Sequence, residues 1–304
     1  MCGRLRSRTT HNRFPVADII HDIDAMQSRA EQTRLRGMTV GVVPTMGALH
    51  EGHCSLIRIA REQADLVIVT VFVNPTQFGA GEDFSKYPRS LERDVAAAAR
   101  SGADVVFAPE AGAMYPAGFQ TSVTVDALTG VLEGASRPGH FRGVATVVTK
   151  LFHITRAHLA VFGQKDAQQV AVIRQMVRDL NLPVAIVVGP IVRESDGLAM
   201  SSRNAYLSPE ERRQASALYR SLRLGEQMIG DGERDAARIR SLMAALIARE
   251  STGRIDYISI ADPGSLRELA ILPEPGEALV SLAVRFGSTR LIDNCVVAVV
   301  RRES

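Results

Sequence analysis

Residues 42–53 read VVPTMGALHEGH, and the rest of the chain is organised around this stretch. An apolar run ends in a Pro-Thr-Met-Gly turn, and the residues after His-x-Gly-His place apolar side chains at helical spacing as far as Gln63. The pattern predicts a buried strand, a tight glycine turn and a helix. A helix that begins directly after a strand presents unpaired backbone N–H groups and the positive end of its dipole, which together attract phosphate.

Two histidines and two glycines give this turn its chemical character. His50 and His53 are three residues apart, so they lie on one helix face and can reach the same phosphate group. Gly47 and Gly52 allow the backbone to approach a ligand that a Cβ atom would obstruct. Taken alone, His-x-Gly-His is equally consistent with two surface histidines beside a turn. The strand before it and the helix after it favour the phosphate site.

The bulk composition is that of an ordinary globular protein. The chain has 304 residues, of which 46% are hydrophobic, and this suffices for one large α/β domain and a smaller one. Lys and Arg number 36 against 33 Asp and Glu, and the net charge of +3 is too small and too scattered to indicate a nucleic-acid partner. A local basic pocket for an anionic substrate remains compatible with this balance.

Cysteine usage and hydropathy bear on the compartment. Cys2, Cys54 and Cys295 lie far apart with no C-x-x-C spacing, so neither a zinc site nor a disulfide framework is indicated. The sequence lacks an apolar run of the roughly 18 residues that span a membrane. Residues 1–13 are rich in arginine and lack the apolar core of a secretory signal, so we expect them to form a loose basic tail. We therefore expect a cytoplasmic protein with no membrane partner.

Strand and helix patterns alternate along the first two-thirds of the chain. Apolar, β-branched runs predict strands at residues 39–43, 66–73, 103–108, 158–162 and 182–188. Helical spacing predicts helices at residues 14–36, 90–101 and 144–154, and one more that carries a stripe of Val170, Ile173, Val177 and Leu180. A short strand is also expected at residues 122–125. The alternation predicts a parallel, doubly wound α/β sheet.

The sequence pattern changes after Gly189. Ser208 begins a helix with a capping box, since Glu211 stands three positions on, and this helix is expected to run to Gly225 or Gly230. A second helix at residues 233–248 precedes three strand-like runs at residues 255–260, 279–284 and 294–300. Helices followed by strands predict a small α+β domain. We therefore divide the chain into domains at residues 14–191 and 192–304.

Three polar clusters follow strands of the predicted sheet, at residues 43–53, 74–78 and 162–169. In open α/β sheets the carboxyl ends of the strands meet at one edge, where ligands bind. Lys165 alone is better explained as a solvated lysine and Gln77 alone as a turn cap, so the convergence carries the argument. A Ser-Ser-Arg cluster at residues 201–203 stands near the domain junction, where a second half of the site can close over the first.

Several longer motifs occur in order along the chain: PTMGALHEGH, FVNPTQF, RPGHFRGV, VFGQKDAQQ, GLAMSSRNAYLS and RFGSTRLIDN. From about residue 14 to residue 300 the sequence resembles the pantothenate synthetase family of pantoate–β-alanine ligases. The resemblance implies a Rossmann-like nucleotidyltransferase fold related to class I aminoacyl-tRNA synthetases, and a homodimer formed through the larger domain. It also implies ATP-dependent condensation of (R)-pantoate with β-alanine through a pantoyl adenylate, with release of AMP and pyrophosphate, in coenzyme A biosynthesis.

The resemblance also assigns individual residues. His53, as proton donor, His50 and Lys165 would be catalytic, whereas Gln77, Gln169 and Asn74 would bind substrate. The ATP site would comprise Met46, Gly47, Ala48, Leu49, His50, Glu51, Gly52, His53, Gly163, Gln164, Lys165, Asp166, Val192, Met200, Ser201, Ser202 and Arg203. Mg²⁺ would accompany ATP, but no residue is assigned to a metal. The family often has an acidic residue where Arg93 precedes Asp94, so a magnesium role for that pair is not expected here.

The residues themselves support adenylating chemistry. The carboxylate of pantoate is ionised at neutral pH because its reference pKa is about 4, so its attack on ATP needs no base. The step does need stabilisation of the pyrophosphate leaving group, which the helix start, His50, His53, Lys165 and Mg²⁺ would supply. Arg203 suits either a phosphate or the β-alanine carboxylate. The sequence offers no evident base for the β-alanine amine.

Two other functions share the His-x-Gly-His pattern. One is a nucleotidyltransferase that joins a nucleotide to a phosphorylated alcohol. The other is a non-catalytic regulator that binds ATP on the same fold, although the chemically active residues argue against it. A tRNA synthetase is disfavoured, because no segment remains for an anticodon-binding domain.

Overall fold

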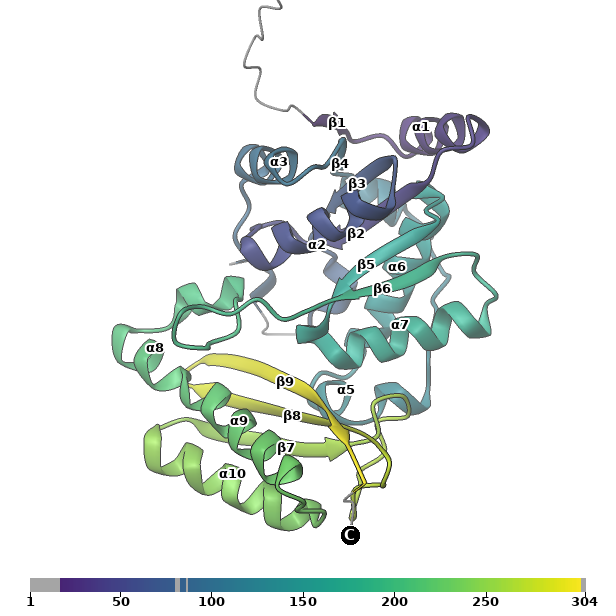
Figure 1. Ribbon diagram of the computed structural model, residues 1–304. Coiled ribbons are helices and arrows are strands. Elements are labelled where there is room, and N and C mark those ends of the chain that lie inside the picture. The colour runs from purple at the N-terminus through teal and green to yellow at the C-terminus, as the bar shows by residue number, and fades with distance from the viewer. Residues whose placement is uncertain (1–16, 80–82, 86, 302–304) are drawn as a thin grey trace, which may run out of the picture.

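The computed structural model describes residues 17–79, 83–85 and 87–301, so the expected tail at residues 1–13 lies outside the described residues. Its larger half is a parallel six-stranded sheet in the order β1-β4-β3-β2-β5-β6 (Figure 1). The strands are β1 (Asp18–Ile20), β2 (Val40–Thr45), β3 (Leu66–Val71), β4 (Val105–Phe107), β5 (Leu159–Gly163) and β6 (Ala185–Gly189). The chain runs outward from β2 to β4 and then returns to β5 on the other side of β2. The predicted doubly wound, Rossmann-like sheet is therefore confirmed.

Helices cover both faces of this sheet. The helices α1 (Ile23–Leu35), α6 (His140–Thr155) and α7 (Ala167–Asp179) pack on one face, whereas α2 (Glu51–Gln63) and α3 (Leu91–Arg100) pack on the other. Successive residues of β3 alternate between the two cores, since Ile68 belongs to the first and Val69 to the second. A strand buried on both faces reads as an unbroken apolar run, which is why its position was predictable.

The smaller half is an antiparallel sheet of β7 (Arg254–Ala261), β8 (Gly276–Phe286) and β9 (Thr289–Val299). It follows α8 (Pro209–Ala215), α9 (Ala217–Gly230) and α10 (Ala236–Glu250), and the last two helices cover one face of the sheet (Figure 1). The other face turns toward the parallel sheet and its helices. Helices followed by an antiparallel sheet confirm the α+β prediction for this part of the chain.

Three local expectations were wrong. The helix expected from residue 14 begins only at Ile23, because Asp18–Ile20 pair with β4 as an edge strand. Residues 122–125 form no strand, and the backbone N–H of Val123 instead donates to Thr146 Oγ1 at 3.0 Å. The capping box of Ser208 and Glu211 is present, but its helix ends at Ala215 and a separate helix follows.

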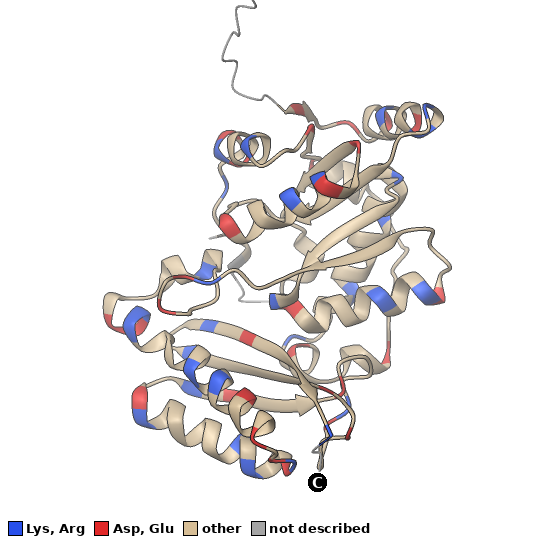
Figure 2. Ribbon diagram, viewed as in Figure 1, with Lys and Arg blue, Asp and Glu red and all other residues tan. Residues whose placement is uncertain are grey.

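The remaining elements are short. They are α4 (Ala111–Met114), α5 (Leu132–Ser136) and the 3-10 helices η1 (Pro75–Gln77), η2 (Asp83–Ser85), η3 (Ala127–Thr129), η4 (Gln164–Asp166) and η5 (Ser202–Tyr206). Figure 2 shows basic and acidic residues interspersed on the helices of both halves. No helix in the described ranges has both the length and the apolar character that a membrane span requires.

Candidate active site

A cavity of about 220 Å³ opens at the carboxyl ends of β2, β3 and β5, which are neighbours in the sheet. The direction of winding reverses between β2 and β5, so the cavity occupies the switch point at which α/β sheets bind ligands. Helices α2 and α7 both begin here and turn their N-termini toward it. Most of the predicted site residues border it: Met46, His50, Gly52, His53, Asn74, Gln77, Gly163, Lys165, Asp166, Gln169, Val192, Met200, Ser201, Ser202 and Arg203.

His50 and His53 cap the start of α2 reciprocally. His50 Nδ1 accepts the backbone N–H of Gly52 at 3.1 Å, and His53 Nδ1 accepts the backbone N–H of His50 at 3.3 Å. These hydrogen bonds assign the proton of each neutral ring to Nε2. The ring centroids are 4.1 Å apart, so the two rings form one unit at the cavity wall.

The histidine pair is electrically neutral. Burial and, as the next cause, the positive charge of Lys165 together lower the pKa of His50 to about 4. Burial also lowers the pKa of His53 to about 3, with His50 as the next cause. At neutral pH both rings therefore act as N–H donors without charge, and the fixed positive charge comes from Lys165. The ammonium of Lys165 lies 3.7 Å from Asp166 Oδ1.

The turn between β2 and α2 is held from behind by a buried carboxylate. Asp94 on α3 accepts the backbone N–H of Ala48 at 3.0 Å and that of Leu49 at 2.8 Å. Five of the predicted ATP residues do not border the 220 Å³ cavity: Gly47, Ala48, Leu49, Glu51 and Gln164. The side chain of Glu51 is exposed and forms an ion pair with Arg58. Sequence reasoning missed Asp94 as the residue that shapes this turn.

Asn74 and Gln77 form a buried amide pair after β3. Asn74 is 1% exposed, and its Nδ2 donates to Gln77 Oε1 at 3.2 Å and to the backbone O of Gly143 at 3.1 Å. Its Oδ1 accepts the hydroxyl of Tyr115 at 2.9 Å. Gln77 Nε2 then lies 2.9 Å from Met46 Sδ. The hydrogen bonds of Asn74 thus orient Gln77, while Gln77 faces the cavity.

Two successive glutamines at the start of α7 have different surroundings. Gln168 is buried, and its Nε2 donates to the backbone oxygens of Leu128 and Val131, both at 2.8 Å. Gln169 borders the cavity, and its side-chain amide has no hydrogen-bond partner among the described residues. The amide of Gln169 is therefore available to a ligand, whereas that of Gln168 supports a loop.

Arg137 and His140 also border the cavity, although no role was predicted for them. His140 Nδ1 donates to the backbone O of Gln77 at 2.8 Å, and Arg137 Nη1 donates to His140 Nε2 at 3.1 Å. The only signal in the sequence was the RPGHFRGV motif, which carries no spacing that specifies a role. Apolar side chains complete the wall, including Phe72, Val144, Val147, Val148 and Leu151.

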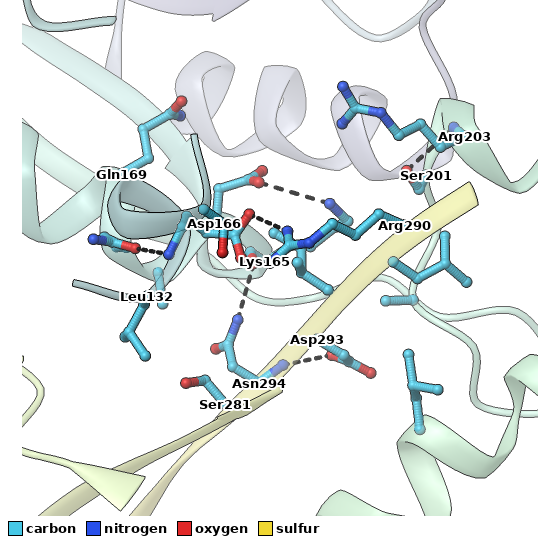
Figure 3. A pocket seen from close by; sticks show the side chains of 18 of the residues that line it. Leu132, Lys165, Asp166, Gln169, Ser201, Arg203, Ser281, Arg290, Asp293 and Asn294 are labelled. Carbon is cyan, nitrogen blue, oxygen red and sulfur yellow. Dashed lines mark hydrogen bonds and ion pairs between the residues drawn. The ribbon is translucent and has the colours of Figure 1, made fainter. Parts of the chain in front are cut away.

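A second cavity of about 530 Å³ is lined by residues of the antiparallel sheet and of the β5–α7 turn (Figure 3). It shares seven lining residues with the first cavity: Arg137, His140, Lys165, Asp166, Gln169, Ser201 and Arg203. From the sheet, Ser281, Arg290 and Asn294 face into it. The two cavities therefore form one cleft, and Lys165 stands at their junction.

The segment that connects the two halves is also ordered by hydrogen bonds. The backbone N–H of Met200 donates to Val192 O at 3.0 Å, so these two predicted ATP residues lie side by side. Arg193 forms two hydrogen bonds with the buried Asp293, at 2.6 and 3.0 Å. Ser201 Oγ caps the following 3-10 helix by accepting the backbone N–H of Arg203 at 3.2 Å. The Ser-Ser-Arg cluster lines the same cavity as His50 and His53.

The sequence and the fold both match known proteins. The chain matches the family described as Pantoate-beta-alanine ligase over residues 18–296. It is 56% identical to the pantothenate synthetase of Heliobacterium modesticaldum over 281 residues, which are 92% of this chain and 99% of that one. It is 58% identical to that of a Roseiflexus species over 268 residues, 88% of this chain and 95% of that one.

Solved structures agree with these matches. The pantothenate synthetase of Thermus thermophilus superposes with a TM-score of 0.85 at 44% identity, covering 91% of this chain and 98% of that chain. The pantoate–β-alanine ligase of Francisella tularensis, solved in complex with β,γ-ATP and β-alanine, gives a TM-score of 0.75 at 33% identity, with coverage of 92% and 97%. The chain belongs to the pantoate–β-alanine ligase family.

Proposed function

We propose that this protein condenses pantoate with β-alanine at the cost of ATP, through a pantoyl adenylate, and releases AMP and pyrophosphate. One observation carries the proposal: a single cleft gathers two helix N-termini, the His50–His53 pair, Lys165 and the free amide of Gln169 at the switch point of the sheet. Family membership supports the same reaction. The Francisella relative, solved in complex with β,γ-ATP and β-alanine, is consistent with it.

The phosphate side of the cleft serves the first step. The Nε2–H groups of His50 and His53 and the ammonium of Lys165 hold the phosphates of ATP, with Ser201–Arg203 opposite them. A carboxylate oxygen of pantoate attacks the α-phosphorus, and the bond from that phosphorus to pyrophosphate breaks. Negative charge then grows on pyrophosphate, where neutral donors and one fixed cation stabilise it without a proton transfer. His53, whose pKa burial lowers to about 3, thus acts as a hydrogen-bond donor and not as the proton donor that the resemblance implies.

The other side of the first cavity suits pantoate. Gln77 and Gln169 offer amide donors and acceptors to its hydroxyl groups without adding charge. Phe72, Val144 and Val147 form an apolar wall that accommodates its two methyl groups. In the second step the amine of β-alanine attacks the acyl carbon and AMP leaves. Arg137 and Arg203 border both cavities, and either guanidinium fits the carboxylate of β-alanine.

Mg²⁺ would bind as part of the MgATP substrate. The carboxylate of Asp94 already accepts two backbone N–H groups, so it is committed to the turn it holds. The side chain of Asp166 is 47% exposed in the cleft and is the carboxylate best placed to join the phosphates around the ion. Such shared coordination is usual for Mg²⁺, which would neutralise part of the phosphate charge.

Three further features belong to the proposal. The chain divides into domains at residues 14–191 and 192–304, which is supported because no described strand after Gly189 joins the parallel sheet. The protein is a homodimer and acts in the cytoplasm, as the family resemblance implies. Sedimentation velocity at two protein concentrations would test the dimer, and a monomer at both would contradict it.

Product analysis tests the reaction. With ATP, Mg²⁺, pantoate and β-alanine, we expect AMP and pantothenate in equal amounts, and neither when one acid is omitted. A nucleotidyltransferase would instead retain the nucleotide in its product. A regulator would bind ATP but convert nothing. Either of these results would reject the proposed function.

A further inference from the structure

Asn294 connects the antiparallel sheet to the turn that carries Lys165. It belongs to the RFGSTRLIDN motif at residues 285–294, which has no part in the steps described above. Although it lies on β9, its Nδ2 donates to the backbone oxygens of Gln164 at 3.0 Å and of Lys165 at 2.9 Å. Its Oδ1 accepts Gln164 Nε2 at 3.0 Å. Figure 3 shows this amide pointing from β9 toward Lys165 and Asp166.

The turn that Asn294 holds is a single 3-10 turn, η4, between β5 and α7. Hydrogen bonds in such a short turn have poor geometry, so the turn gains definition from outside partners. Lys165 is its central residue, and the Lys165 side chain lines the same 220 Å³ cavity as His50 and His53. Fixing two successive carbonyl groups of this turn fixes the direction in which the Lys165 side chain leaves the backbone.

Asn294 is itself fixed. It is 3% exposed, and its backbone N–H donates to Asp293 Oδ1 at 2.8 Å. Asp293 is anchored by its two hydrogen bonds to Arg193, in the segment that connects the two halves of the chain. On the other side, Asn294 is in register with Ser281 of β8. Contacts within its own half of the chain therefore hold the Asn294 amide in place, independently of its hydrogen bonds to the turn.

We propose that Asn294 is a positioning residue, which holds the Lys165 ammonium where it can stabilise the departing pyrophosphate. The first step therefore depends on docking of the antiparallel sheet against the β5–α7 turn. Asn294 acts through the backbone of Lys165 and touches no substrate. Gln164, a predicted ATP residue, has the same positioning role, because its side-chain amide is hydrogen-bonded to Asn294. This inference rests on the proposed function only in taking Lys165 to act on the phosphates.

A double-mutant cycle tests it, with pantoate-dependent exchange of pyrophosphate into ATP as the assay. We expect Asn294→Ala to lower the kcat of exchange on the order of 10- to 100-fold, because small displacements of a catalytic group have effects of that size. In the Lys165→Ala background the same substitution should have almost no further effect, since the group that it positions is gone. Independent effects that multiply would overturn the proposal, as would an unchanged kcat for Asn294→Ala.

The control breaks a different contact between the two halves. Glu133 of α5 accepts hydrogen bonds from Arg290 Nη1 at 2.5 Å and from the Tyr257 hydroxyl at 2.8 Å, and it does not contact Lys165. Any effect of Glu133→Gln should therefore multiply with that of Lys165→Ala. Coupling in this control as well, with no further effect of Glu133→Gln once Lys165 is absent, would overturn the proposal, because docking in general and not Asn294 would then be responsible.

A milder variant guards against misfolding. Gln164→Ala removes only the side-chain hydrogen bond to Asn294 and leaves the buried amide in place. It should lower kcat less than Asn294→Ala does, and again only when Lys165 is present; a loss that persists without Lys165 would overturn the proposal. Failure of the proposed function has a different signature, because the wild-type protein would then show no exchange before any variant is compared.

Discussion

Replacing Gly52 by alanine should separate the activity of the site from the stability of the fold. An ideal Cβ atom at residue 52 would lie 2.9 Å from both Cε1 and Nδ1 of His50. That spacing is shorter than real Cβ contacts, so the imidazole ring must move. Its Nδ1 would then lose the backbone N–H of residue 52, and its Nε2 would turn away from the phosphates.

The two consequences differ in size. Alanine in place of glycine near a helix start gains up to about 1 kcal/mol of stability. Loss of the His50 cap costs about 0.5–2 kcal/mol, so the net change in unfolding free energy is small. The melting temperature should therefore shift by only a few degrees. The displaced donor should lower kcat/KM for exchange on the order of 10- to 100-fold.

The assay pairs thermal unfolding with pantoate-dependent exchange. Gly112→Ala on α4 is the matched control, because a Cβ atom there would meet nothing within 4 Å; it should exchange at the wild-type rate and melt at or slightly above the wild-type temperature. A Gly52→Ala protein that is stable and exchanges at the wild-type rate would refute the role given to the His50 ring. Activity loss accompanied by unfolding would equally contradict the expected separation.

Three further predictions concern neighbouring groups. The pKa values of His50 and His53 are lowered from 6.5 to about 4 and about 3, so the unfolded chain binds more protons below pH 6.5. Stability should therefore fall as the pH drops from about 6.5 toward 4, by up to about 1.4 kcal/mol per pH unit for each histidine, and a smaller slope for His53→Gln in urea unfolding would check this. Asp94→Ala should lower the unfolding free energy by about 3 kcal/mol or more, since two backbone N–H groups lose a charged acceptor, and an unchanged urea midpoint would contradict it. Gln169→Ala should raise the KM for pantoate about 2- to 10-fold at constant stability, whereas Gln168→Ala should lower stability, and identical thermal profiles for both would be contrary evidence.

The central part of the fold was predictable because local pattern and tertiary role agree there. Runs such as residues 66–71 are buried on both faces of the sheet, so their apolar character alone identifies them. The strand order then brings the three polar clusters together, because β3, β2 and β5 are neighbours. The adjacency of His50, Gln77 and Lys165 thus followed from general topology.

The elements that were predicted wrongly are those whose sequence pattern fits two different local structures. Apolar residues before Ile23 fit a helix, but three of the residues there pair with β4 instead. Val123 packs against the core without a partner strand, so its alternation with Val125 did not specify a strand. Contacts across long sequence separations, such as Asp94 to Ala48 or Asn294 to Lys165, leave no periodic signal and required the structure.

Isotope exchange with the wild-type protein tests the central claim most directly. Labelled pyrophosphate should enter ATP when pantoate and Mg²⁺ are present and β-alanine is absent, because the adenylate forms and reverses before the amine is needed. Without pantoate there should be no exchange. Exchange that requires β-alanine, or that proceeds without pantoate, would contradict a pantoyl adenylate formed at the His50–His53 end of the cleft.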